Sequence, residues 1–235
     1  MIRRLVMACC LAAPCVAQFL PSLQAKSREE FDAYLTAVGA PSPHTLVEAA
    51  ARFAARWPES ELTVRVCELQ LEAYRKLGDA AAALAAGERG LRAAPGYPPL
   101  LVEAAAIEAN ATTDRSRLEK ARARAREALE RIEAASAPRD MRPEAWEQAV
   151  ARLSSRAWAA SGLAAFKLGR DSEAIAEFER ALALHPPPAD PSQQYRLALL
   201  YRASGRATEA RRLLEQVARC GDAAFEKMAR AALGR

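Results

Sequence analysis

Residues 158–186 read WAASGLAAFKLGRDSEAIAEFERALALHP and decide the fold. The small residues Gly162 and Ala174 lie in two helical runs, where larger side chains would hold neighbouring backbones apart. Gly169 separates the two runs, as a glycine often does just beyond the end of a helix. Pro186 follows the second run and cannot continue its hydrogen-bond ladder. The stretch therefore predicts two helices packed closely around a tight turn.

With Trp158, Phe178 and Ala181, this spacing resembles the tetratricopeptide repeat (TPR), a helix–turn–helix of about 34 residues. The two aromatic residues are expected to fill the space between the helices. Two positions depart from the family pattern: Ser161 replaces the usual Leu and Ala165 the usual Tyr.

Two further copies have the same period. Gly205 lies 36 residues after Gly169, and another copy lies upstream around Gly78. The best repeats are expected at 64–97, 155–188 and 191–224. The residues that carry the signature are Tyr74, Gly78, Ala83, Pro95, Trp158, Gly162, Gly169, Ala174, Phe178, Ala181, Pro186, Tyr201, Gly205 and Ala210.

The repeats predict an all-α fold, and the resemblance implies a right-handed solenoid of antiparallel helix hairpins. Composition agrees, because alanine is the best helix former and 51% of the 235 residues are hydrophobic. We expect one continuous repeat domain over 27–235, with about five hairpins and a C-terminal capping helix. The expected helices cover 27–37, 42–56, 60–77, 80–94, 99–111, 115–134, 143–168, 171–185, 191–204, 207–219 and 222–233. Asp171 and Asp222 are expected to be N-caps, and Ser27 with Glu30 a capping box.

The first 17 residues resemble a secretory signal peptide. Arg3 and Arg4 precede an apolar run over 5–13, and residues 15–17 are small. We expect cleavage after Ala17, a short extended segment over 18–26, and export to the periplasm, the cell envelope or the medium. A lipoprotein is the alternative, but Cys15 follows Pro14, which fits a lipid-attachment site poorly. The apolar run is too short for a stable transmembrane helix.

Cleavage would leave 32 basic against 29 acidic residues, because Arg3 and Arg4 leave from a total of 34, so the net charge would be +3. Such a modest charge does not indicate nucleic-acid binding. The densest basic run, 115–131, has apolar residues at helical spacing and no aromatic residues for base stacking. We interpret it as the solvated face of an amphipathic helix, with Arg126 paired to Glu130. Cys67 and Cys220 are expected to be unpaired thiols at helix interfaces.

No catalytic, metal or cofactor motif is found, so an enzyme is not predicted. His44 and His185 are far apart, and neither has a Cys or carboxylate at ligand spacing. No phosphate-binding glycine loop or nucleophile elbow is present. The resemblance implies a non-catalytic protein that binds another protein or peptide, as a monomer or with weak self-association.

In the TPR family the first helix of each pair lines a concave groove. By this resemblance, the groove residues are Arg156, Ala159, Leu163, Phe166 and Lys167 in one repeat, Tyr195, Leu199, Arg202 and Ala203 in the next, and Glu68, Glu72, Arg75 and Lys76 upstream. The two downstream repeats offer an apolar strip with basic edges, which suits a segment with apolar anchors and some acidic residues. Alternatively, these side chains pack against neighbouring repeats or the terminal helix.

Residues 53–62 resemble repeat boundaries in TPR proteins of the Gram-negative cell envelope, among them the assembly lipoprotein of the outer-membrane β-barrel machinery. The alternative function is therefore a structural subunit or cap of an envelope complex, without an independent ligand groove.

Overall fold

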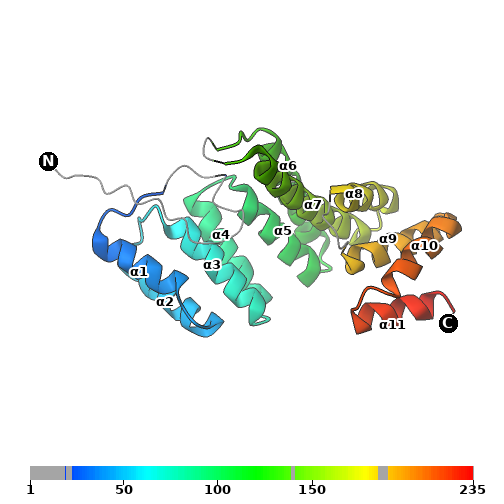
Figure 1. Ribbon diagram of the computed structural model, residues 1–235, viewed down its shortest axis with the longest axis horizontal. Helices are drawn as coiled ribbons and strands as arrows, with labels where there is room; N and C mark the ends of the chain where they lie inside the picture. The colour runs from blue at the N-terminus through cyan, green and yellow to red at the C-terminus, as the bar shows by residue number, and fades with distance from the viewer. Residues whose placement is uncertain (1–18, 20–22, 139–140, 185–189, 235) are drawn as a thin grey trace.

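The computed structural model describes residues 19, 23–138, 141–184 and 190–234. The described part folds into eleven α-helices that pack in consecutive antiparallel pairs (Figure 1). The prediction of an all-helical stack of about five hairpins with one further helix is confirmed. The helices are α1 Arg28–Val38, α2 Pro43–Arg56, α3 Thr63–Lys76, α4 Ala80–Ala93, α5 Pro98–Ala111, α6 Arg115–Glu133, α7 Pro143–Lys167, α8 Asp171–Leu184, α9 Pro191–Ala203, α10 Ala207–Val217 and α11 Ala223–Ala232.

Helix starts follow the capping residues. Asp222 accepts from the first backbone amides of α11, as expected. The expectation for Asp171 was wrong, because α8 begins at this residue, whose charge lies in the first turn. The capping box at Ser27 is only half formed: Ser27 accepts from the Glu30 amide, whereas the Glu30 carboxylate accepts from the amide of Lys26.

Glycine ends the first helix of three hairpins. Gly78, Gly169 and Gly205 have φ values of 76°, 73° and 81°. Residues with a Cβ avoid this left-handed region, so glycine allows the sharp reversal into the second helix. The three turns that the repeat alignment matched therefore share one backbone geometry.

The hairpin α7/α8 is closed by an aromatic ring against a glycine. Phe178 is 1% exposed, and a Cβ added at Gly162 would lie 3.1 Å from its ring. The two helices meet closely at Gly162, as predicted. The residue that Gly162 contacts is Phe178, however, and not the expected Ala174. Trp158 is only half-buried, and the Arg180 guanidinium lies 4.7 Å from its ring centroid.

The other signature residues pack as the repeat requires. Ala83, Ala174, Ala181 and Ala210 are buried where helices meet, and Tyr201 is 6% exposed. Tyr74 packs half-buried against the core, and Pro95 is exposed just beyond α4. Pro186 lies outside the described residues, as does the predicted signal peptide.

The two expected thiols are free, but in different settings. Cys67 is buried in α3, and burial raises the pKa of its thiol. Cys220 is exposed between α10 and α11. Its predicted place at a helix interface was wrong, because the chain turns there before α11 begins.

Candidate protein-binding face

The first helices of successive hairpins pack on one another at three of the five steps along the stack. Helix α5 packs on α7, α1 on α3, and α9 on α11. We call the side formed by α1, α3, α5, α7, α9 and α11 the first-helix face, and the side formed by α2, α4, α6, α8 and α10 the second-helix face. The predicted binding residues all belong to helices of the first-helix face, so their partners show which of them are available.

In the N-terminal part of this face, charged side chains form ion pairs with one another across three helices. Arg75 from α3 lies 3.1 Å from the carboxylate of Glu103 in α5, and Arg156 from α7 binds the same carboxylate. Glu72 pairs with Arg75 at 3.2 Å and with Lys76 at 3.7 Å. The structure thus brings together predicted residues from separate repeats. Sequence analysis missed Glu103, which joins them, because it lies in the pair with the least regular repeat pattern.

Glu68 is also engaged. Its carboxylate lies 2.6 Å from Arg65, and Arg65 donates to the Tyr97 hydroxyl at 3.1 Å. Burial raises the pKa of Glu68 despite the nearby guanidinium. The cluster joins α3 to the start of α5, so Glu68 contributes to packing between hairpins.

The apolar residues predicted on α7 differ in exposure. Leu163 is 5% exposed and lies in the core. Phe166 and Ala159 are half-buried, and Phe166 packs against the edge of the same core cluster. Leu199, on α9, is half-buried as well. Phe166 and Leu199 are therefore the apolar candidates that keep some surface.

Lys167 caps the C-terminal end of α5. Its Nζ donates to the carbonyl oxygens of Ala109, Asn110 and Thr112 at 2.7, 2.9 and 3.0 Å. These carbonyls belong to the C-terminal end of α5, where the helix dipole favours a cation. Burial, followed by the proximity of Arg196, lowers the pKa of Lys167.

Helix α11 engages two of the predicted residues on α9. The rings of Tyr195 and Phe225 lie 6.4 Å apart, and Arg202 donates to the carbonyl of Ala232 at 3.3 Å. Ala203 is exposed at the end of α9. Part of the predicted strip is thus in contact with the terminal helix.

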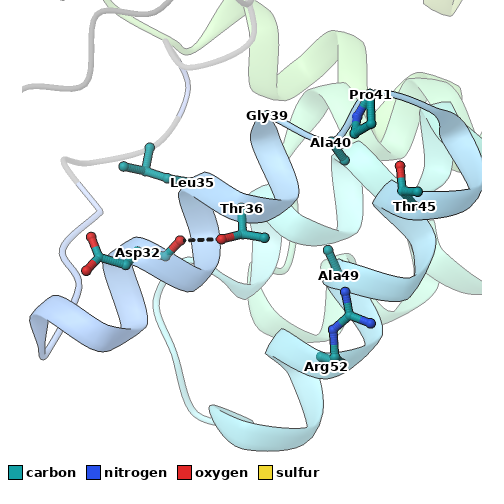
Figure 2. Close-up of a pocket in the computed structure, with 9 residues that line it drawn as sticks. All are labelled: Asp32, Leu35, Thr36, Gly39, Ala40, Pro41, Thr45, Ala49 and Arg52. Carbon is teal, nitrogen blue, oxygen red and sulfur yellow. Dashed lines mark hydrogen bonds between the residues drawn. The ribbon is translucent and has the colours of Figure 1, made fainter.

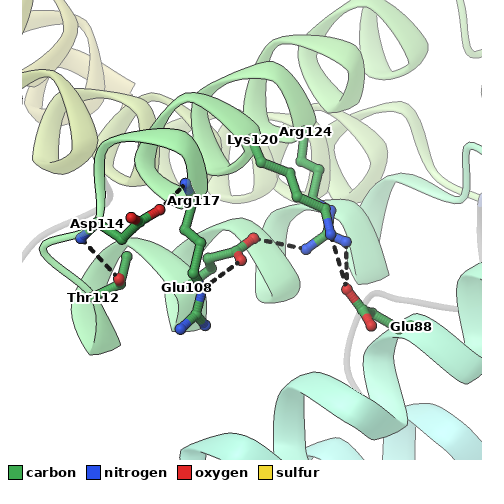
Figure 3. A network of polar contacts seen from close by, with 7 residues as sticks. All are labelled: Glu88, Glu108, Thr112, Asp114, Arg117, Lys120 and Arg124. Carbon is green, nitrogen blue, oxygen red and sulfur yellow. Dashed lines mark hydrogen bonds and ion pairs between the residues drawn. The ribbon is translucent and has the colours of Figure 1, made fainter.

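The basic run on α6 has a structural role that the sequence did not reveal. Arg124 lies 2.9 Å from Glu108 of α5 and 2.7 Å from Glu88 of α4, while Lys120 lies 3.4 Å from Glu88 (Figure 3). Arg117 adds a second ion pair to Glu108 at 3.2 Å. These ion pairs therefore hold α6 against α5, its own hairpin partner, and against α4 of the preceding hairpin.

The other edge of α6 points to the following hairpin. Arg122 is 3% exposed and contacts Glu173 at 2.5 Å and Glu177 at 2.7 Å. Arg126 lies 3.6 and 3.5 Å from the same carboxylates, so its predicted pairing with Glu130 was wrong. The buried apolar side of α6 is confirmed, but its charged side binds two hairpins and is not simply solvated.

A pocket lies elsewhere in the described part, between α1 and α2 (Figure 2). It has a volume of about 500 Å³ and is lined by Asp32, Leu35, Thr36, Gly39, Ala40, Pro41, Thr45, Ala49 and Arg52. Thr36 donates to the Asp32 carbonyl at 2.8 Å, and the Asp32 carboxylate pairs with Arg28 at 3.6 Å. Arg52 pairs with Glu48 at 3.9 Å. The two charged residues that line the pocket therefore pair with neighbours on their own helices and not with each other.

In the described ranges, no group of three or more His, Cys, Asp or Glu residues could hold a metal ion. Among the same residues, none of the helices combines the length and apolar character needed to span a bilayer.

The structure thus defines a stack of TPR-like helix hairpins. A family model described as "Tetratricopeptide repeat" matches residues 155–188, the same 34 residues that the sequence pattern delimits. Residues 155–188 therefore match a tetratricopeptide repeat, and the other hairpins of the described part have the same antiparallel arrangement. No curated protein sequence matches the chain significantly.

Solved structures share the fold at low sequence identity. PilF from Pseudomonas aeruginosa aligns with a TM-score of 0.58 and 17% identity, over 83% of this chain and 78% of that one. MamA from Desulfovibrio magneticus RS-1 gives 0.54 and 16%, over 82% and 94%. TTC0263, a TPR protein from Thermus thermophilus, gives 0.51 and 21%, over 88% and 97%. At these identities the likeness concerns the fold alone.

Proposed function

We propose that the chain is a non-catalytic scaffold that binds a polypeptide segment on the first-helix face of α7 and α9. TPR proteins generally serve protein–protein interaction, and the repeat at 155–188 includes part of α7. The observation that carries the choice of site is the contrast along this face. Arg75 and Arg156 are already ion-paired to Glu103 between α3, α5 and α7, whereas Phe166 and Leu199 keep apolar surface next to basic residues.

The strip suits a segment that presents apolar side chains and some acidic ones. Half-buried apolar residues lose little conformational entropy on binding, because their neighbours already restrain them. Basic residues beside them favour an acidic partner and raise its association rate. Because Tyr195 and Arg202 contact α11, we expect Phe166 and Leu199 to carry most of the apolar contact.

The test is partner capture with the double variant Phe166→Ala/Leu199→Ala. The matched control is Ile175→Ala/Leu182→Ala, which removes two half-buried apolar residues from α8. Tagged proteins, first checked for helicity and melting midpoint, are used to capture proteins from an extract of the source cells, and bound proteins are quantified by mass spectrometry. We expect the first variant to lose a partner that the control keeps. A folded first variant with unchanged capture would instead favour a structural subunit without a ligand site on this face.

We also propose that the chain is exported and processed after Ala17, as the pattern of residues 3–17 indicates. The intact mass of protein recovered from the producing cell tests this proposal. We expect a mass that begins at Gln18 and carries no lipid. A mass that retains residues 1–17, or one that includes an acylated cysteine, would contradict it.

A further inference from the structure

One half-buried arginine on the first-helix face differs from all comparable arginines in the described residues. Six of the seven arginines that are buried or half-buried there bind a carboxylate or an amide oxygen. Arg65, Arg122, Arg124, Arg170 and Arg206 each pair with a glutamate, and Arg89 donates to Gln70.

Arg196 is the exception. It lies on α9 between Tyr195 and Leu197 and makes no hydrogen bond or ion pair with any described residue. Asp190 supplies attraction only from beyond ion-pair distance, and burial lowers the pKa of Arg196. A desolvated guanidinium with five unused donors is unfavourable unless something compensates it.

A cation from the preceding hairpin makes the position of Arg196 less favourable still. Lys167, from α7, lies close enough to Arg196 to be repelled by it. Lys167 cannot move away without losing its bonds to the end of α5, where it caps Ala109 and Asn110. The two side chains come from α7 and α9, the helices that also carry Phe166 and Leu199. Residues 190–235 as a whole are basic, with nine basic and five acidic residues and a net charge of +4.

We propose that Arg196 binds an acidic side chain of the polypeptide that docks on α7 and α9. A guanidinium matches a carboxylate with two parallel N–H···O bonds, which supplies orientation as well as affinity. The bound carboxylate would also separate Arg196 from Lys167 and relieve their repulsion. The expected ligand motif is an acidic residue next to an apolar one, with the apolar residue placed against Phe166 or Leu199. This inference rests on the proposed function and specifies the partner's chemistry.

The first test needs no partner. If Arg196 is kept for binding, its neutralisation should leave stability unchanged or increase it, because a desolvated and repelled charge is removed. We expect Arg196→Gln to melt at the wild-type temperature or above it. The matched control is Arg170→Gln, which breaks the ion pair with Glu119 and should melt lower. A decrease for Arg196→Gln as large as that of the control would show a structural role and overturn the proposal.

The second test uses two fluorescein-labelled synthetic peptides of 12 residues, one of alternating Glu and Leu and one of alternating Gln and Leu. Fluorescence anisotropy at low salt should show binding of the Glu peptide to the wild-type protein, weakened by about tenfold or more in Arg196→Gln. Arg211→Gln, which neutralises an exposed arginine of α10, should bind as the wild type does. Absence of binding, equal binding of the Gln peptide, or no effect of Arg196→Gln would each overturn the proposal.

The capture experiment separates this inference from the proposed function. If Phe166→Ala/Leu199→Ala loses the partner and Arg196→Gln keeps it fully, the docking face stands and the carboxylate site does not. If both variants keep it, the docking face is wrong as well. Sedimentation velocity tests whether a second copy of the chain occupies the site. Self-association that Arg196→Gln abolishes would identify that second copy as the ligand and overturn the peptide site.

Discussion

Helices α6 and α9 carry positive charge in opposite ways. Helix α6 has seven basic residues, and six of them pair with carboxylates, mostly from the hairpins on either side. Helix α9 has two arginines, and neither makes an ion pair with a described residue. Basic density in the sequence is therefore a poor guide to a binding site here. The informative quantity is the charge left over after the neighbouring hairpins have supplied their partners.

The largest expected effect is at the most buried ion pair of α6. Arg122→Ala should lower the free energy of unfolding by about 3 kcal/mol, because Glu177 would remain buried with a weaker partner. Arg126, 3.5 Å from the same carboxylate, keeps the loss at the low end of the usual range. Chemical denaturation measures it.

Two further variants sharpen that result. Arg115→Ala, at an exposed position of the same helix, should stay within about 0.5 kcal/mol of the wild type. The double variant Arg122→Leu/Glu177→Leu removes both charges and should recover much of the stability. If Arg122→Ala were as mild as Arg115→Ala, α6 would not be the electrostatic link between the hairpins.

The next largest effect on stability is expected for apolar packing between α7 and α8, which should not depend on salt. Gly162→Leu would drive a side chain into the ring of Phe178 and should cost about 1–3 kcal/mol as overpacking. The melting midpoint of the variant, measured at low and high salt, should fall equally in both. An unchanged midpoint would mean that α7 and α8 do not meet at Gly162.

What could and could not be predicted from the sequence follows the range of the interactions. Helix ends and the turns at Gly78 and Gly205 depend on nearby residues, so capping patterns and repeat spacing found them. Arg126 was assigned to Glu130 on its own helix, yet its partners lie on α8. Arg196 was overlooked for the same reason, because its significance depends on Lys167 in the preceding hairpin. Pairing between hairpins requires the register of the stack, which local patterns do not contain.

Acid should weaken the paired regions. A hydrogen bond from Arg124 lowers the pKa of Glu88, and one from Tyr201 lowers that of Glu179. A carboxyl with a lowered folded-state pKa stabilises the fold above its unfolded pKa, about 4.3 for Glu, and this contribution is lost as pH falls through the folded value. The melting midpoint should therefore decline below about pH 4.5. Glu88→Gln and Glu179→Gln should flatten this decline, and a decline of undiminished slope in both would contradict the assignment.

The smallest effect on stability is expected at an exposed ion pair of α6. Arg117 is half exposed and shares Glu108 with Arg124, which lies 2.9 Å from that carboxylate and is far less exposed. Arg117→Ala should therefore cost at most about 1 kcal/mol, since Glu108 keeps its better partner and exposed ion pairs contribute little. The cost should fall further at 1 M salt, where the Debye length is about 3 Å. Urea denaturation at low and high salt measures both values. A loss of stability as large as that of Arg122→Ala, or one that salt leaves unchanged, would contradict this prediction. It would show that Arg117 stabilises α6 as strongly as the buried Arg122 does.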